Sequence, residues 1–263
     1  MSVPILPVHK NLSADKASKI RLDQLLVERG LAENRTRARA LAMAGLVFGG
    51  GKRLDKPGQC IAADTPLEIK GWNHPWVSRG GIKLAHGLEH FSIFPQGSVC
   101  LDVGASTGGF TDVLLSQGAA RVYAVDVGRG QLAWKLRQDS RVVLLEKTNA
   151  RNLNREQVPE PIDLLVCDAS FIGLETVLPA PLALVRPGGR LIALVKPQFE
   201  AGKGKVGKGG VVRDPDLHRQ VIERIRAWLE GKAGWSVLGV AESPIKGPKG
   251  NREFLIAARH EPY

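Results

Sequence analysis

The second half of the chain shows short apolar runs separated by segments long enough to form helices. Five of these runs predict buried strands, at residues 99–103, 122–127, 142–146, 164–167 and 191–195. An amphipathic segment at 216–229 predicts a late helix, and residues 236–242 and 253–259 predict two closing strands. Strands that alternate with helices form a mostly parallel sheet with both faces covered. We therefore expect an α/β fold in this part of the chain.

The first part of the chain has a different pattern. Apolar residues recur at helical spacing over residues 20–30, and a second helix is expected over 34–45, where Asn34 is the candidate N-cap. Short β-like pieces at 46–48 and 66–69 surround a turn-rich stretch. The pattern predicts a small α+β domain that is distinct from the sheet.

These changes of pattern divide the chain into four segments. Residues 1–18 are expected to form a flexible tail, because they have neither a continuous apolar core nor a cleavage site typical of a secretory signal. Residues 19–70 form the small domain, residues 71–77 form a linker interrupted by Gly, Asn and Pro, and residues 78–263 form the α/β domain. No apolar run approaches the roughly 20 residues that a membrane-spanning helix needs.

The net charge of the chain favours a polyanionic partner. The formal net charge is +11, and Lys and Arg release counterions when they contact phosphates. A basic enzyme without such a partner and a protein of the membrane surface are the alternatives. The three cysteines, Cys60, Cys100 and Cys167, form no CxxC pair and no metal-ligand spacing, so we expect reduced thiols, a cytoplasmic protein and no metal site.

A glycine-rich turn follows the first strand of the α/β domain, in VCLDVGASTGGFTDVLL. It matches neither GxGxxG nor a Walker loop, and Asp126 follows the next strand, where an acid accepts hydrogen bonds from ribose hydroxyls. These features favour S-adenosylmethionine over NAD, although the same glycines also suit a tight turn that binds nothing. The candidate cofactor residues are Asp102, Gly104, Ala105, Ser106, Thr107, Gly108, Gly109, Phe110, Asp126, Asn149 and Asp168.

Four polar residues stand at expected strand ends or beside glycine turns: Lys83, Asp168, Lys196 and Glu253. Asp168 and Lys196 directly follow apolar runs, and the carboxyl ends of parallel strands carry the ligand crevice in such sheets. A ribose hydroxyl is a poor nucleophile, so its methylation needs a base, and burial beside another cation favours a neutral lysine. Each residue taken alone would be an ordinary solvated surface charge.

Several longer motifs resemble a known family: RLDQLLVERGLA, AGLV, HPWVSRGGIKL, LDVGASTGGFT, CDASFI, VKPQFEAGKGKVGKGGVVRD and GNREFL. Over roughly residues 19–260 the chain is similar to the TlyA family, in which an RNA-binding domain of the ribosomal-protein S-four type precedes a Rossmann-like, FtsJ-like methyltransferase domain. The resemblance implies ribose 2′-O-methylation of ribosomal RNA at cytidines. In that pattern Lys196 is the main base, Asp168 supports it, and Lys83 and Glu253 shape the site.

Basic side chains gather in two places that could hold RNA phosphates, which position a nucleic acid without specifying its sequence. The candidates are Arg21, Arg35, Arg39, Lys52, Arg53 and Lys56 in the small domain and Lys203, Lys205 and Lys208 in AGKGKVGKGG. The second group follows the Lys196 strand, so we expect either a mobile basic flap or a passive linker. The hairpin at 48–58 departs from the family pattern by its run of glycines, which leaves its RNA contacts open.

Three functions therefore compete on the sequence alone. The leading one is an RNA methyltransferase whose partner is ribosomal RNA or a ribosomal subunit, with no membrane involved. A membrane-lytic protein is the second, since the family carries a haemolysin label. A ribosome-assembly factor that binds RNA and cofactor without catalysis is the third, although a pure binding protein has no need of a base.

Overall fold

The computed structural model describes residues 19–32, 34–70, 74–202, 204, 206–207 and 209–262. The expected tail, the first residues of the expected linker and the three lysines of the expected flap lie outside these ranges. The chain divides into two compact units, Met1–Asn73 and His74–Tyr263. Val77, which we expected in the linker, is only 8% exposed and belongs to the second unit.

The first unit is small and mixed. Its elements are β1 (Lys19–Arg21), α1 (Leu22–Glu28), α2 (Arg35–Met43), β2 (Val47–Gly49), β3 (Lys52–Arg53), β4 (Cys60–Ala62) and β5 (Leu67–Ile69). The strands form two little sheets, β1-β4 and β3-β2-β5, and the helices cover a core that includes Leu22, Leu26 and Leu41. Asn34 caps α2 by accepting the Arg37 N–H at 2.9 Å, so the predicted N-cap is confirmed.

The second unit alternates strands and helices as the apolar pattern predicts. Its elements are α3 (Gly80–His90), β6 (Val99–Val103), α4 (Gly109–Ser116), β7 (Arg121–Val125), α5 (Trp134–Arg137), β8 (Val142–Leu145), η1 (Ala150–Asn152), β9 (Ile162–Cys167), α6 (Leu174–Val177), α7 (Pro179–Leu182), β10 (Val185–Val195), α8 (Pro197–Glu200), α9 (Pro215–Glu230), β11 (Trp235–Glu242), η2 (Pro248–Gly250) and β12 (Phe254–His260).

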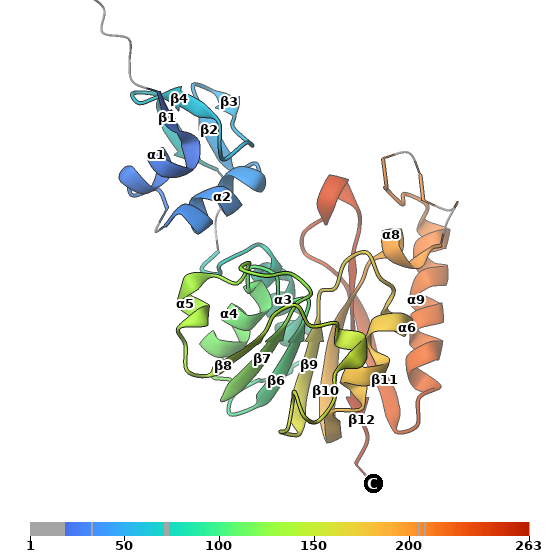
Figure 1. Cartoon of the computed structure of the whole chain (residues 1–263). Helices are drawn as coiled ribbons and strands as arrows, with labels where there is room; N and C mark the ends of the chain where they lie inside the picture. Colours follow the sequence, from blue (N-terminus) through green and yellow to red (C-terminus); the bar gives the residue numbers. More distant parts are fainter. Residues whose placement is uncertain are drawn as a thin grey trace, which may run out of the picture. The chain divides into compact units, whose positions relative to one another are not determined.

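The seven strands of this unit form one sheet in the order β11-β12-β10-β9-β6-β7-β8 (Figure 1). The pairs from β10 through β9, β6 and β7 to β8 are parallel, whereas β12 runs antiparallel between β10 and β11. The mostly parallel sheet is therefore confirmed. The chain order reverses between β6 and β9, which makes their carboxyl ends the expected place for a ligand.

Two apolar layers bury the two faces of the sheet. One contains Leu84 and Leu88 of α3 and Leu114 of α4, and the other contains leucine and valine side chains of α6, α7 and α9. Figure 1 shows α3 and α4 on one side of the strands and α6 and α9 on the other. A sheet buried on both faces needs continuous apolar runs, which is why its central strands were visible in the sequence.

The structure corrects two details of the sequence analysis. Lys83 lies within helix α3, which the sequence analysis did not predict because the segment opens on two adjacent glycines. Glu253 precedes β12 and does not form its first residue, since pairing with β10 begins at Phe254. In the part of the chain that the structure describes, no helix is long and apolar enough to cross a membrane.

Candidate active site

The candidate site lies at the edge where the parallel strands end. Asp126, Asp168 and Lys196 each come directly after a strand that points to this edge. Because β12 is antiparallel, its amino-terminal end reaches the same edge and brings Glu253 there. The topology thus gathers residues that are far apart in the sequence.

The glycine turn after β6 is shaped for close approach. Gly104 and Gly108 have φ values of +85° and +95°, which side chains rarely adopt, and Ser106 is also left-handed at +48°. A Cβ on Gly104 would lie 3.0 Å from the backbone nitrogen of Ala169. The turn therefore packs directly on the segment that follows Asp168. Ala105 and Phe110 are only 5% and 3% exposed, so both residues are buried at this turn.

Asp126 holds the glycine turn to the neighbouring strand end. Its carboxylate accepts the Ser106 N–H at 2.8 Å and the Gly128 N–H at 2.7 Å. A carboxylate has about four lone-pair sites, so acceptor capacity remains for ribose hydroxyls. The two backbone bonds fix the side chain in place before any ligand arrives.

Asp102 lies inside the unit behind the turn. It is fully buried, and its Oδ2 accepts the Thr111 hydroxyl at 2.7 Å. Burial raises the pKa of Asp102 to about 7, and the carboxylates of Asp168 and Asp126 act in the same direction. Its Oδ1 has no hydrogen-bond partner among the described residues. An acceptor left over at this position fits a donor on the ligand, such as an amino group.

Asn149 stands farther along the same edge, at the start of η1. Its Oδ1 accepts the Arg151 N–H at 3.1 Å and so caps this short helix. The amide oxygen is thereby used within the protein, and only the amide nitrogen is left to meet an adenine ring. The role of Asn149 toward the cofactor stays a prediction.

The four polar residues singled out in the sequence lie together as a chain of alternating charges. Lys83 Nζ is 2.7 Å from Glu253 Oε2 and 3.7 Å from Asp168 Oδ2. Lys196 Nζ is 2.5 Å from Asp168 Oδ1. The side chains of the two lysines are 10% and 7% exposed, and that of Glu253 is fully buried. Charged groups can be buried to this extent because each one is paired with an opposite charge.

Further contacts fix Lys196 and Glu253, which stand at the two ends of this series of alternating charges. Lys196 Nζ donates to the Asp168 carbonyl oxygen at 3.0 Å and to Ser170 Oγ at 2.9 Å. Glu253 also accepts from Gln198 Nε2 at 3.3 Å. A Cβ at Gly247 would lie 2.1 Å from Glu253 Oε1, so a side chain there would displace the carboxylate. Ser170, Gln198 and Gly247 were missed by the sequence analysis, although the first two stand inside motifs that it quoted.

The cations predicted to bind RNA in the first unit are all exposed, but they differ in their partners. Arg21 and Arg35 both pair with the buried Asp23 carboxylate, at 3.0 and 3.2 Å. Their hydrogen bonds lower the pKa of Asp23 to about 2. Arg39, Lys52, Arg53 and Lys56 project from α2 and from the hairpin around β3.

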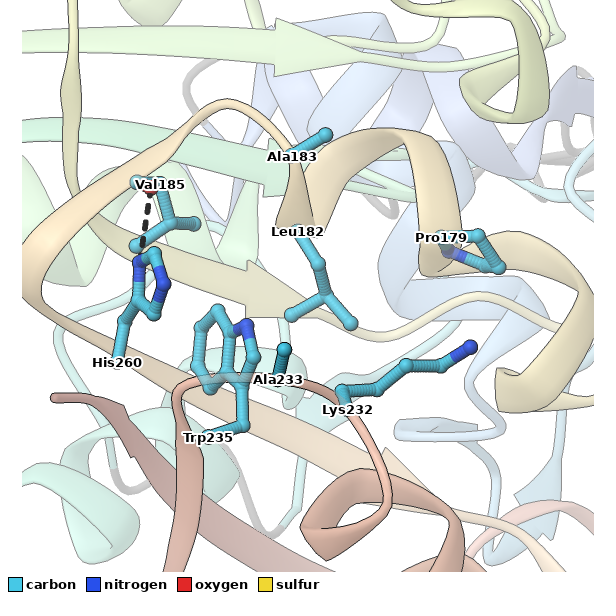
Figure 2. Close-up of a pocket in the computed structure, with 8 residues that line it drawn as sticks. All are labelled: Pro179, Leu182, Ala183, Val185, Lys232, Ala233, Trp235 and His260. Carbon is cyan, nitrogen blue, oxygen red and sulfur yellow. Dashed lines mark hydrogen bonds between the residues drawn. The ribbon is translucent and has the colours of Figure 1, made fainter.

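A separate cavity of about 270 Å³ lies at the opposite edge of the sheet (Figure 2). Val185 begins β10 there, Trp235 begins β11, and His260 ends the antiparallel β12. The Trp235 and His260 rings stack at 5.1 Å, and a ring nitrogen of His260 meets the Val185 carbonyl oxygen at 3.2 Å. No member of the four-residue set lines this cavity, so it is not the candidate active site.

Comparisons with known proteins agree with both units. Residues 76–260 match the model of the family described as FtsJ-like methyltransferase, and residues 20–61 match the S4 domain. The 16S/23S rRNA (cytidine-2′-O)-methyltransferase TlyA of Mycobacterium tuberculosis is 49% identical over 92% of this chain and 91% of its own length. Hemolysin A of Brachyspira hyodysenteriae is 39% identical over 90% of this chain and 98% of its own length. A solved structure from Streptococcus thermophilus, named as a hemolysin, superposes with a TM-score of 0.72 at 44% identity, over 94% of this chain and 90% of that one.

Proposed function

Because this chain belongs to the FtsJ-like methyltransferase family, we propose that it transfers a methyl group from S-adenosylmethionine to a ribose 2′-oxygen of ribosomal RNA. The names of the relatives from Mycobacterium tuberculosis and Campylobacter jejuni favour a cytidine as the target. The S4 domain favours RNA as the partner. An RNA substrate and three free cysteines fit a protein that acts in the cytoplasm.

The glycine turn and its acids are suited to hold the cofactor. Gly104 lets the turn pack against the segment after Asp168, Asp126 offers lone pairs to ribose hydroxyls, and Asp102 Oδ1 is an unused acceptor. When bound, S-adenosylmethionine supplies an activated methyl group on a sulfonium. The protein must then place the RNA hydroxyl in line with that group and remove its proton.

Lys196 is the residue that we propose as the base. It stands at the end of β10, and its neighbours Asp168 and Ser170 fix the position of its Nζ. It must be neutral when it accepts the hydroxyl proton. Lys83 contacts the other oxygen of the same Asp168 carboxylate, at 3.7 Å. Asp168 orients the amine, and Glu253 balances the charge of Lys83.

The observation that carries this proposal is the assembled lysine–carboxylate chain beside the glycine turn. Lys83 and Glu253 are separated by 170 positions in the sequence, yet they meet at 2.7 Å in a buried site. Burying two ion pairs costs stability, and apolar side chains of similar volume would serve a purely structural role at least as well. Their place at the carboxyl edge, next to the glycine turn, supports a catalytic role.

The test is methyl transfer from isotopically labelled S-adenosylmethionine to purified ribosomal subunits, with the modified ribose located by mapping. We expect 2′-O-methylation by the full chain and none by Lys196→Ala, while the variant still binds cofactor. Subunits that stay unmethylated by the wild-type chain, despite cofactor and RNA binding, would support the assembly-factor alternative. Leakage of vesicles treated with the same protein would revive the membrane-lytic alternative.

A further inference from the structure

Glu200, at the end of α8, is a buried carboxylate that stands outside the four-residue set. Its side chain is 3% exposed, and burial raises its pKa above the ordinary glutamate value. It lies four positions after Lys196, and its backbone N–H donates to the Lys196 carbonyl oxygen at 3.2 Å. A buried acid at such a place needs a structural or functional account.

The Glu200 carboxylate reaches across to the segment that follows Asp168. Its Oε1 accepts the Leu174 N–H at 2.8 Å. A Cβ at Gly173 would lie 3.1 Å from its Oε2, so the backbone passes close to the carboxylate. Glu200 therefore joins the helix that begins after Lys196 to the segment that begins at Asp168.

Arg224 of α9 holds the Glu200 carboxylate in this orientation. Its Nη2 donates to Glu200 Oε2 at 3.0 Å and to the Glu200 carbonyl oxygen at 2.9 Å. Its Nη1 donates to Glu175 Oε2 at 3.0 Å. Arg224 thus contacts two acids, but of these only Glu200 also binds the Leu174 backbone.

Residues 168–174 are in this way fixed at both ends. Lys196 holds the beginning through the Asp168 carbonyl oxygen and the Ser170 hydroxyl, and Glu200 holds the end through Leu174. Between them Phe171 has a φ of +66°, an unfavourable conformation for a side-chain-bearing residue that persists only where its surroundings impose it. The pairing of β9 with β10 ends at Cys167 and Ala193, so it does not itself fix this segment.

We propose that Glu200 is a positioning residue for methyl transfer: by holding residues 168–174 against α8, it sets the distance between Asp168 and Lys196. This inference rests on the proposed function of the site. Glu200 touches neither RNA hydroxyl nor cofactor in this account. Its effect passes through the orientation of the Lys196 amine.

The test compares Glu200→Ala with the wild-type full chain in the methylation of ribosomal subunits. We expect kcat to fall roughly 10²-fold, the order that a displacement of about 1 Å costs, with KM for RNA and cofactor affinity unchanged. Glu200→Gln keeps an oxygen that can accept the Leu174 N–H, so it should recover part of the lost rate. Glu175→Gln is the matched control, since it removes the other acid bonded to Arg224 and should leave kcat unchanged.

A second measurement keeps this inference separate from the proposed reaction. In protein labelled with ¹³C-lysine, the Lys196 side-chain signal should shift in Glu200→Ala and stay in place in Glu175→Gln. Failure of the wild-type protein to methylate ribosomal RNA would refute the proposed function. The spectrum would still show whether Glu200 sets the position of the Lys196 amine. An unshifted Lys196 signal, a full kcat in Glu200→Ala, or an equal loss in Glu175→Gln would each overturn the positioning role.

Discussion

Lys196 is held from three sides, by the Asp168 carboxylate at 2.5 Å, by the carbonyl oxygen of the same residue, and by Ser170. This arrangement fits a base that must be aimed, and it also fits a structural cation that only closes the segment. Lysine and arginine distinguish the two roles, because a guanidinium stays protonated at any working pH.

We therefore predict that Lys196→Arg loses methyl transfer while it still binds cofactor and RNA. A charged side chain at this place can keep the ion pair with Asp168, but it cannot accept a proton. Methylation is measured on ribosomal subunits and binding by calorimetry. Near-normal turnover in Lys196→Arg, with the methyl group still on ribose oxygen, would show that Lys196 is not the base.

Asp126 allows a test of the cofactor site alone. Asp126→Ala removes the proposed acceptor for ribose hydroxyls and also the bonds to the Ser106 and Gly128 N–H groups. We expect calorimetry to show strongly weakened S-adenosylmethionine binding. Glu156→Gln, an exposed acid elsewhere on the second unit, should bind as the wild type does. Equal affinities for wild type and Asp126→Ala would remove Asp126 from the site.

Asp102 gives the second unit a pH-dependent stability. Its pKa is about 7 when folded, against an ordinary value of 3.8, so the folded protein holds a proton that the unfolded chain has released. The resulting stabilisation is complete below about pH 4 and lost as the pH rises through about 7. A difference of roughly three units corresponds to at most about 4 kcal/mol.

We predict that Asp102→Asn flattens the change in free energy of unfolding between pH 4 and 7. The amide is neutral throughout, and one of its atoms can still meet the Thr111 hydroxyl. Denaturant unfolding without cofactor measures the effect, with Glu156→Gln as the exposed-acid control. A pH dependence in Asp102→Asn as steep as that of the wild type would assign it to other groups.

At the scale of single elements, the glycine turn after β6 combines two constraints that the sequence could not separate. Gly104 has a positive φ, and it also has backbone atoms of Ala169 at contact distance. Gly97 has a positive φ of +72°, but a Cβ added there would have nothing within 4 Å. Substitutions at these two glycines therefore separate the effect of backbone strain from the effect of a steric clash with Ala169.

We predict that Gly104→Ala and Gly97→Ala each destabilise the protein by about 1 kcal/mol or more, since alanine is strained at positive φ. Only Gly104→Ala should also weaken cofactor binding, because its methyl group pushes the turn away from the Asp168 segment. Unfolding and cofactor titration of both variants provide the comparison. Equal cofactor affinity in the two variants would mean that the turn need not approach Ala169.

The elements also explain what the sequence could predict. Strands β6, β7, β9 and β10 were recognised because both of their faces are buried, which makes their apolar runs continuous, and the edge strand β8 is apolar and partly buried on both faces. The strands β1, β3 and β4 span only two or three residues, too few to show any periodicity. Helix α3 was missed because its first turn contains Gly80 and Gly81, where Gly81 leaves room for the Trp76 ring.

The sequence predicted the members of the candidate site and the pairing of Lys196 with Asp168, but it did not predict the pairing of Lys83 with Glu253. Strand ends and the family resemblance named Lys83, Asp168, Lys196 and Glu253. That Lys83 pairs with Glu253 depends on the direction of β12, which no local pattern reveals. The contribution of Glu200 depends on how α8 meets the segment after Asp168, which is likewise a tertiary property.

At the scale of the whole molecule, the two units divide the tasks that we propose. The first presents exposed cations and the second contains the four-residue set. We predict that Lys52→Ala combined with Lys56→Ala weakens RNA binding evenly across sequences and leaves cofactor affinity unchanged. Cations on phosphates release counterions, so the variant should also show a shallower dependence of affinity on salt.

Binding to ribosomal RNA measured over a range of salt concentrations tests this prediction. Lys232→Ala is the control, because Lys232 lines the cavity at the edge of the sheet away from the candidate site. It should keep the wild-type salt slope. A double variant with unchanged affinity and slope would mean that this hairpin does not contact phosphates.

The antiparallel placement of β12 between β10 and β11 has a consequence for refolding. Lys83 and Glu253 can meet only after a loop of 170 positions has closed, whereas the helices and the neighbouring parallel strands form over shorter separations. Contacts of such high contact order form slowly. After dilution from denaturant, ellipticity should therefore return before enzymatic activity, and the lag between the two signals would report the closure of the Lys83–Glu253 contact.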